Sequence, residues 1–204
     1  MGNDRKEEIV LATLELAAEK GLANVSMSMI ADKIGIKKPS IYKHFDSKDE
    51  IVEAMYQYLR KQAKEKANIK PIDYSTLFTG KTAFEVLQAL VHGYIRMNQQ
   101  EEMLNFYKVI YSERSIQPMA AKIVAEETEK MILATKQLFY AMEVHKVLHF
   151  EDADMSAVSF AMTIHGLMDY ELDQVYGECK EETAGKHLLE DYMKWFCEEN
   201  RVKD

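Results

Sequence analysis

The chain has 204 residues, of which 47% are hydrophobic, so it is long enough for one or two compact domains with a buried core. Its formal net charge of −8 excludes a protein that binds nucleic acid through overall positive charge. The two cysteines, Cys179 and Cys197, form no C-x-x-C pair, so neither a zinc site nor a disulfide framework is expected. No window approaches the roughly 18 apolar residues of a membrane span, and the N-terminus lacks a secretory signal. We therefore expect a cytoplasmic protein without a membrane partner.

The first forty residues carry the pattern of two amphipathic helices joined through a glycine. An apolar stripe with helical spacing is formed by Ile9, Ala12, Thr13, Leu16 and Ala17. Gly21 is expected to end this first helix. Ser26 is placed to cap a second helix over about residues 27–34, and Gly35 supplies the turn after it.

A third and a fourth helix follow at once. Pro39 suits the first turn of a short helix that ends near His44, because proline lacks the N–H that is unpaired there. Ser47 and Glu50 have capping-box spacing, which predicts a fourth helix from residue 47 to about Lys66.

A connector over Asn68–Gly80 separates these elements from a longer helical part. Helical patterns recur at about 82–98, 102–113, 119–146, 153–177 and 184–199, and no strand pattern is long enough to predict a sheet. We expect an all-α protein of about nine helices.

Positive charge is concentrated beside the glycine turn. Residues 33–48 carry five lysines against Asp46, a local balance of +4, whereas residues 51–204 have a balance of −7. Two helices around a glycine turn let the second helix enter the major groove of DNA, where lysines and a tyrosine hydroxyl bind phosphate. Lys38, Ser40 and His44 are candidates to reach base edges. The alternative is a solvated charged face.

The segment Ile9–Ala54 resembles the DNA-binding domain of the tetracycline-repressor (TetR) family of bacterial transcription regulators. The resemblance covers about a quarter of the chain and rests on Ile9, Ala12, Leu16, Gly21, Ser26, Ile30-Ala31, Gly35-Ile36, Ser40-Ile41-Tyr42, His44-Phe45, Ser47-Lys48 and Ile51. It implies a three-helix DNA-binding domain over residues 1–48, followed by a helical ligand-binding and dimerisation domain over residues 49–204.

The resemblance also implies which residues contact a double-stranded DNA operator. These are Ser26, Ser28, Lys37, Lys38, Pro39, Ser40, Tyr42, Lys43, His44 and Lys48. Lys37 stands where the family often has a serine that caps the recognition helix, so the base preference is harder to infer. Helix N–H groups after residue 47, together with Lys48, are expected to bind one phosphate.

The C-terminal part offers candidates for an effector site and for a dimer interface. Aromatic side chains and methionines suit an adaptable wall against a hydrophobic or aromatic effector. The candidates are Tyr94, Met97, Met103, Phe106, Tyr107, Tyr111, Phe139 and His165, and the alternative for each is an ordinary core position. Small and apolar positions on the last two helices indicate a homodimer interface with Met162, Gly166, Asp169, Trp195 and Phe196.

His145 and His149 have the i, i+4 spacing of a metal-binding pair, but no H-E-x-x-H motif or other catalytic motif occurs. No cofactor and no catalytic residues are expected. The sequence thus predicts a DNA-binding repressor that a small effector releases from a palindromic operator. The alternatives are an activator, a protein-interaction module whose helix-turn-helix no longer binds DNA, and a metal-dependent enzyme using these two histidines.

Overall fold

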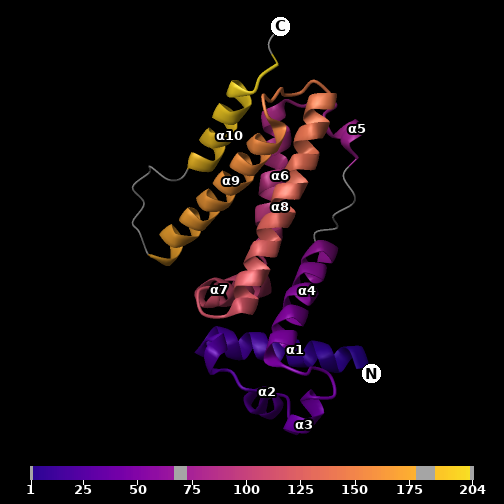
Figure 1. The fold of residues 1–204 in the computed structure, drawn as a ribbon, viewed down its shortest axis with the longest axis vertical. Coiled ribbons are helices and arrows are strands. Elements are labelled where there is room, and N and C mark those ends of the chain that lie inside the picture. Colours follow the sequence, from indigo (N-terminus) through magenta and orange to yellow (C-terminus); the bar gives the residue numbers. More distant parts are fainter. Residues whose placement is uncertain (1, 67–72, 178–186, 203–204) are drawn as a thin grey trace. The chain divides into compact units, whose positions relative to one another are not determined.

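The computed structural model describes residues 2–66, 73–177 and 187–202 (Figure 1). These residues form helices and their connections, without a strand among them. The predicted all-α class is confirmed. In chain order the elements are α1 (Gly2–Lys20), the 3-10 helix η1 (Leu22–Asn24), α2 (Met27–Lys33), α3 (Lys38–Ile41), α4 (Lys48–Lys66), α5 (Tyr74–Leu77), α6 (Ala83–Asn98), α7 (Glu101–Glu113), α8 (Pro118–Val144), α9 (Ala153–Tyr176) and α10 (Leu188–Glu199).

The first helix follows its sequence pattern. All five residues of the predicted apolar stripe of α1 are buried. The hydroxyl of Thr13 donates to the Ile9 carbonyl at 2.7 Å, so its burial leaves no unpaired donor. Gly21 has φ +78°, a left-handed conformation that favours glycine, and α1 ends directly before it.

The chain divides into two compact units, one of residues 1–69 and 97–127 and the other of residues 70–96 and 128–204. Packing alone therefore places α7 with the N-terminal helices, because α7 contacts α1, α4 and η1. In Figure 1, α2 and α3 lie on one side of α1, and α7 lies on the other. The helices α6 and α8 each have residues in both units.

The second unit is built around an aromatic cluster. Phe139, which is fully buried on α8, stacks on Phe150 with ring centroids 4.5 Å apart. Phe160 of α9 and Phe196 of α10 complete the cluster, their rings 5.5 Å and 5.4 Å from that of Phe139. Aliphatic side chains of α6 and α8 surround these rings. Burying four aromatic side chains together fixes the packing of α8, α9 and α10.

The predicted helices of the C-terminal part agree with α6 to α10 to within a few residues, although 184–186 lie outside the described residues. The predicted connector contains the short helix α5, and its residues 68–72 likewise lie outside the described part. No helix among the described residues has the length and apolar character needed to cross a bilayer.

Candidate nucleic-acid interface

The first half of the interface is α2, whose two ends are both capped. Ser26 accepts a hydrogen bond from the Met29 N–H at 3.3 Å, as its predicted N-cap role requires. At the other end Gly35 has φ +69°, its N–H donates to the Asp32 carbonyl, and the Ile36 N–H donates to the Ala31 carbonyl at 2.9 Å. These two bonds form a Schellman motif, which ends α2 and directs the chain into the turn.

The second half is the recognition segment, residues 37–44, which contains α3. Lys37 occupies the N-cap position of α3 and makes no side-chain hydrogen bond there. The helix therefore lacks the side-chain cap that a serine at this position would supply. Regular helix ends at Ile41, whose carbonyl accepts the N–H groups of His44 and Phe45 at 2.8 and 3.0 Å. The helix is thus shorter than the predicted one, and residues 42–44 form a turn.

Both halves are fixed by one small apolar core. Ile30 and Ala31 of α2, together with Ile41 and Phe45, are buried, and α2 contacts α3. Because Ala31 is small, α2 and α3 can approach closely. The ammonium of Lys6, on α1, lies 5.1 Å from the centre of the Phe45 ring. The polar side chains of residues 37–44 are left on the outer face.

The structure leaves most of the predicted DNA contacts open to solvent. Tyr42 is 45% exposed and Lys38 places its ammonium 5.9 Å from the Tyr42 ring. Ser26, Ser28, Lys37, Lys38, Pro39, Tyr42 and Lys43 are exposed, whereas Ser40, His44 and Lys48 are half-buried. An exposed aromatic ring beside lysines suits contact with a sugar-phosphate backbone.

Two of the five lysines that define the basic patch bond to oxygen atoms within the protein. Lys33 pairs with Glu15 of α1 at 2.8 Å, and this hydrogen bond raises the pKa of Lys33. The ammonium of Lys48 donates to the carbonyls of Leu22 and Val25, at 2.9 and 3.3 Å. The free positive charge of the outer face therefore comes from Lys37, Lys38 and Lys43.

The start of α4 realises half of the predicted capping box. The Glu50 N–H donates to Ser47 Oγ at 3.1 Å, as expected. The carboxylate of Glu50 accepts instead from the Asp46 N–H, at 2.6 Å, one residue before the predicted partner.

Comparison with known proteins decides what this arrangement is. Residues 9–55 match the family model described as bacterial regulatory proteins, tetR family. Residues 9–55 thus form a DNA-binding domain of the TetR type. TetR regulators are DNA-binding transcription factors and not enzymes.

The relatives extend the likeness beyond this segment. The negative transcriptional regulator IcaR of the biofilm operon icaADBC of Staphylococcus aureus is 29% identical over 136 residues, which cover 62% of this chain and 73% of IcaR. The flavonoid-responsive regulator FrrA matches in structure with a TM-score of 0.74, 21% identity and coverage of 99% of this chain and 100% of FrrA. A transcriptional regulator from Saccharomonospora viridis in complex with choline has a TM-score of 0.67, 20% identity and coverage of 99% and 100%. At such identities the two structures show a shared fold.

The predicted effector-binding residues fall into both units. Met97, Met103, Phe106, Tyr107 and Tyr111 belong to the first unit, and Tyr94, Phe139 and His165 belong to the second. Phe106 is buried against Tyr56 of α4, with centroids 5.9 Å apart. Phe139 is a core residue of the second unit. Five of the eight thus belong to the first unit and three to the second.

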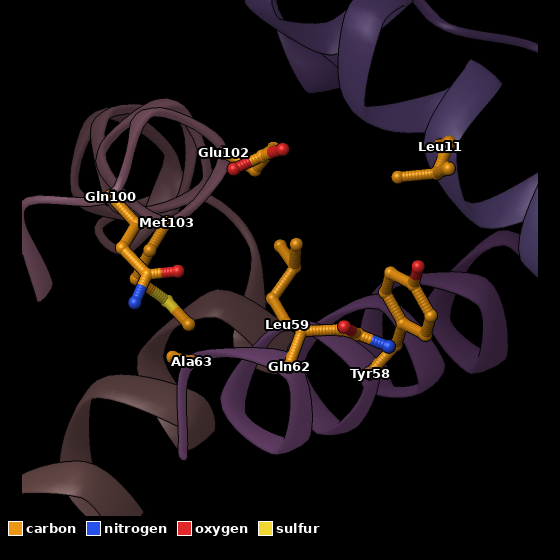
Figure 2. Close-up of a pocket in the computed structure, with 8 residues that line it drawn as sticks. All are labelled: Leu11, Tyr58, Leu59, Gln62, Ala63, Gln100, Glu102 and Met103. Carbon is orange, nitrogen blue, oxygen red and sulfur yellow. The ribbon is translucent and has the colours of Figure 1, made fainter. Parts of the chain in front are cut away.

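A small pocket of the first unit lies between α1, α4 and α7 (Figure 2). Its cavity volume is about 90 Å³, smaller than the roughly 150 Å³ of an enclosed cavity that binds benzene. Met103 is the one predicted effector-binding residue that lines it. Tyr58 donates to Glu7 Oε1 at 2.6 Å, and burial, with this hydrogen bond, raises the pKa of Tyr58 to about 12. In Figure 2 Tyr58 and Glu102 lie on opposite sides of Leu59.

The predicted dimer residues lie mostly on an outer face of α9 and α10. Met162 and Trp195 are 49% and 54% exposed, Gly166 is exposed and Asp169 is half-buried. Phe196 differs, because its ring is only 5% exposed and packs inside the second unit. A Cβ added to Gly166 would meet no atom within 4 Å.

The two histidines of the enzyme alternative lie apart from any cluster of ligands. The His145 ring packs on Phe78 at 5.3 Å, and His149 Nδ1 lies 3.9 Å from Glu143 Oε1. No group of three metal-ligating side chains occurs in the described part of the chain.

Sequence reasoning missed a buried polar cluster in the first unit. Arg60 of α4 pairs with Glu127 of α8 at 2.8 Å and donates to Asn98 of α6 at 2.7 Å. The Tyr56 hydroxyl also donates to Glu127, and burial raises the pKa of Tyr56. These residues are far apart in the sequence, and no local pattern marks them.

Proposed function

We propose that this TetR protein is a homodimeric transcriptional repressor, which a small hydrophobic or aromatic effector releases from a palindromic operator. The observation that carries the proposal is the outer face of the recognition segment, where Lys37, Lys38, Tyr42 and Lys43 are exposed over a buried apolar core. The face is positively charged although the chain as a whole is acidic. Local charge of this kind supports binding to phosphate at one defined place.

Repression rather than activation is favoured by the nature of one relative. IcaR is a negative transcriptional regulator. A helix-turn-helix dimer covers two half-sites with centres about 34 Å apart, which is one turn of DNA. Such a dimer blocks access to the DNA that it covers, so binding alone is sufficient to repress. We place the protein in the cytoplasm, where the operator is.

The outer face of α9 and α10 supports the homodimer. Apolar side chains recur on one side of α9 at Met155, Met162 and Tyr170, and each is exposed. Gly166 lies between the last two and permits close approach of a second helix. Trp195 of α10 is also exposed. An exposed apolar stripe with small and aromatic residues is typical of a surface that a second copy covers.

The chemical class of the effector rests on this chain's own residues. FrrA responds to flavonoids and the Saccharomonospora viridis regulator binds choline, so the fold accepts different ligands. In this chain, Phe106, Tyr107 and Tyr111 form a run of ring contacts, with centroids 5.8 and 6.1 Å apart. Such a run, with Met97 and Met103 in the same unit, suits an aromatic or apolar guest.

We keep the functional division at residue 48, with residues 1–48 for DNA binding and residues 49–204 for effector binding and dimerisation. This division differs from the packing units, because α4 and α7 pack with the N-terminal helices. An effector that binds residues of α7 is then placed to act on the DNA-binding helices. The response requires the effector to bind the two conformations with different affinities.

Selection of random DNA duplexes on the purified protein tests the proposal. We expect enrichment of a palindrome with half-sites one helical turn apart, and retention of that duplex in a gel at low salt. A library from which no motif emerges at low salt would contradict the repressor and favour the protein-interaction module. A motif with a single half-site would contradict the homodimer.

A further inference from the structure

The short helix η1 sets where the helix-turn-helix begins. It joins α1 to α2. Its C-cap residue is Val25, which directly precedes Ser26, the N-cap of α2. A 3-10 helix of three residues has little stability of its own. Its position must therefore be held by side chains from other elements.

Lys48, the first residue of α4, holds the carbonyl side of η1. Its ammonium donates to the Leu22 carbonyl at 2.9 Å and to the Val25 carbonyl at 3.3 Å. The Leu22 carbonyl also accepts from the Val25 N–H at 3.2 Å, so the ammonium adds a second, charge-assisted bond to it. The side chain is half-buried, so these bonds are partly shielded from water.

Glu113, the last residue of α7, reaches the N–H side of η1. Its Oε1 accepts from the Ala23 N–H at 3.4 Å and lies 3.8 Å from the position of a Cβ added to Gly21. The side chain is 7% exposed, and its Oε2 is buried without a hydrogen-bond partner among the described residues.

This placement of Glu113 is costly, which is the reason to assign it a role. Burying a carboxylate oxygen without a partner is unfavourable, and a negative charge in the last turn of α7 opposes the helix dipole. Leu at this position would avoid both costs, and Gln would avoid the second. The polar contact that the carboxylate makes with η1 is the compensating feature.

We propose that Glu113 and Lys48 act together as a clamp on η1, which positions the helix-turn-helix for DNA and connects α7 to it. The cation holds the carbonyls of η1 and the carboxylate holds its Ala23 N–H. Glu113 is thus a positioning residue that lies within the region assigned to effector binding. The effect of the clamp on DNA binding rests on the proposed function. The clamp itself rests on the geometry alone.

A double-mutant cycle on operator affinity tests the clamp. Glu113→Ala and Lys48→Ala are each expected to weaken binding of the selected duplex by about tenfold, and the double variant by little more than one of them. The two effects overlap because either change frees η1. Glu113→Gln, which keeps an oxygen acceptor for the Ala23 N–H, should bind within about twofold of the parent. Effects that multiply, or a Gln variant as weak as the Ala variant, would refute the clamp.

A second measurement needs no DNA. Amide hydrogen exchange at Ala23 should be faster in the Glu113→Ala variant than in the parent, although the two proteins have the same helix content. The amides of α9 should exchange at the same rates in both proteins. The control is Glu102→Ala, which removes an exposed carboxylate from the first turn of the same helix and should leave Ala23 unchanged. Unchanged Ala23 exchange in Glu113→Ala would overturn the proposal. If the parent binds no duplex, the repressor proposal fails, and the exchange result still decides the clamp.

Discussion

The outer lysines of the recognition segment differ from their neighbours in having their charge available. Lys33 pairs with Glu15, and Lys48 donates to two backbone carbonyls. Lys43, in contrast, is exposed beside Tyr42 in the sequence. The bonds of Lys48 within the protein compete with the phosphate contact that the sequence predicts for it. At the residue scale, the salt dependence of DNA binding should follow Lys43 more closely than Lys48.

We predict that Lys43→Ala reduces the slope of log affinity against log salt by about one per subunit, because one phosphate contact per subunit is lost. Its stability should stay within about 0.5 kcal/mol of the parent, since the side chain is exposed. Titrations of the selected duplex at several salt concentrations measure the slope. Lys61→Ala, an exposed lysine of α4, is the matched control and should leave the slope unchanged. Parallel lines for Lys43→Ala and the parent would contradict the contact.

The thiol of Cys197 offers a second test at this scale. Burial, with a smaller effect of Glu198, raises the pKa of Cys197 to about 11. A raised pKa keeps the group as the unreactive thiol at neutral pH, because the thiolate is the nucleophile. We predict slow alkylation by iodoacetamide near pH 8 in the folded protein and fast alkylation in denaturant. Mass spectrometry of a Cys179→Ser variant isolates this thiol, and equal rates in both states would contradict the prediction.

At the scale of elements, the buried cluster on Arg60 joins α4 to α6 and α8. The side chains of Arg60 and Glu127 are only 12% and 10% exposed, and Asn98 and Tyr56 complete the cluster. Such a pair is not strong evidence of net stabilisation, because both charges lose their hydration. Removing one member leaves the other buried and unpaired, which is strongly unfavourable.

We therefore predict that Arg60→Met lowers the free energy of unfolding by about 3–5 kcal/mol. Lys61→Met is its matched control on the next residue of α4, since Lys61 and Glu65 form an exposed pair with 72% and 58% exposed side chains. That change should cost less than about 1 kcal/mol. Urea unfolding followed by circular dichroism gives both values. Similar losses in the two variants would show that the Arg60 cluster does not hold α4.

At the scale of the whole molecule, the proposed homodimer depends on the exposed face of α9. Gly166 is a suitable site for a test, because a Cβ added there meets no atom of its own protomer within 4 Å. We predict that Gly166→Trp keeps its helical fold and sediments as a monomer, whereas the parent sediments as a dimer.

Ala89→Trp provides the control for bulk, since Ala89 is exposed on α6. Its sedimentation should match that of the parent. A Gly166→Trp variant that retains the dimer mass would move the interface away from this face of α9.

The sequence alone determined what depends on neighbours within about four residues. The apolar stripe of α1, the Ser26 cap, the left-handed glycines Gly21 and Gly35 and the exposed recognition segment all followed from it. Hydrogen bonds and apolar spacing within one helical turn set these features, so their residue types reveal them. The resemblance to the TetR family came from the same local features.

Only the tertiary structure decided the partners of the charged residues. Lys48 bonds to a carbonyl 26 residues away, Tyr56 to a carboxylate 71 residues away and Ala23 to Glu113 90 residues away. The packing of α4 and α7 on α1 selects these partners, and nothing in the local sequence encodes which of many carboxylates or carbonyls will be near. For the same physical reason, the sequence located the DNA-binding face but not the residues that hold it in position.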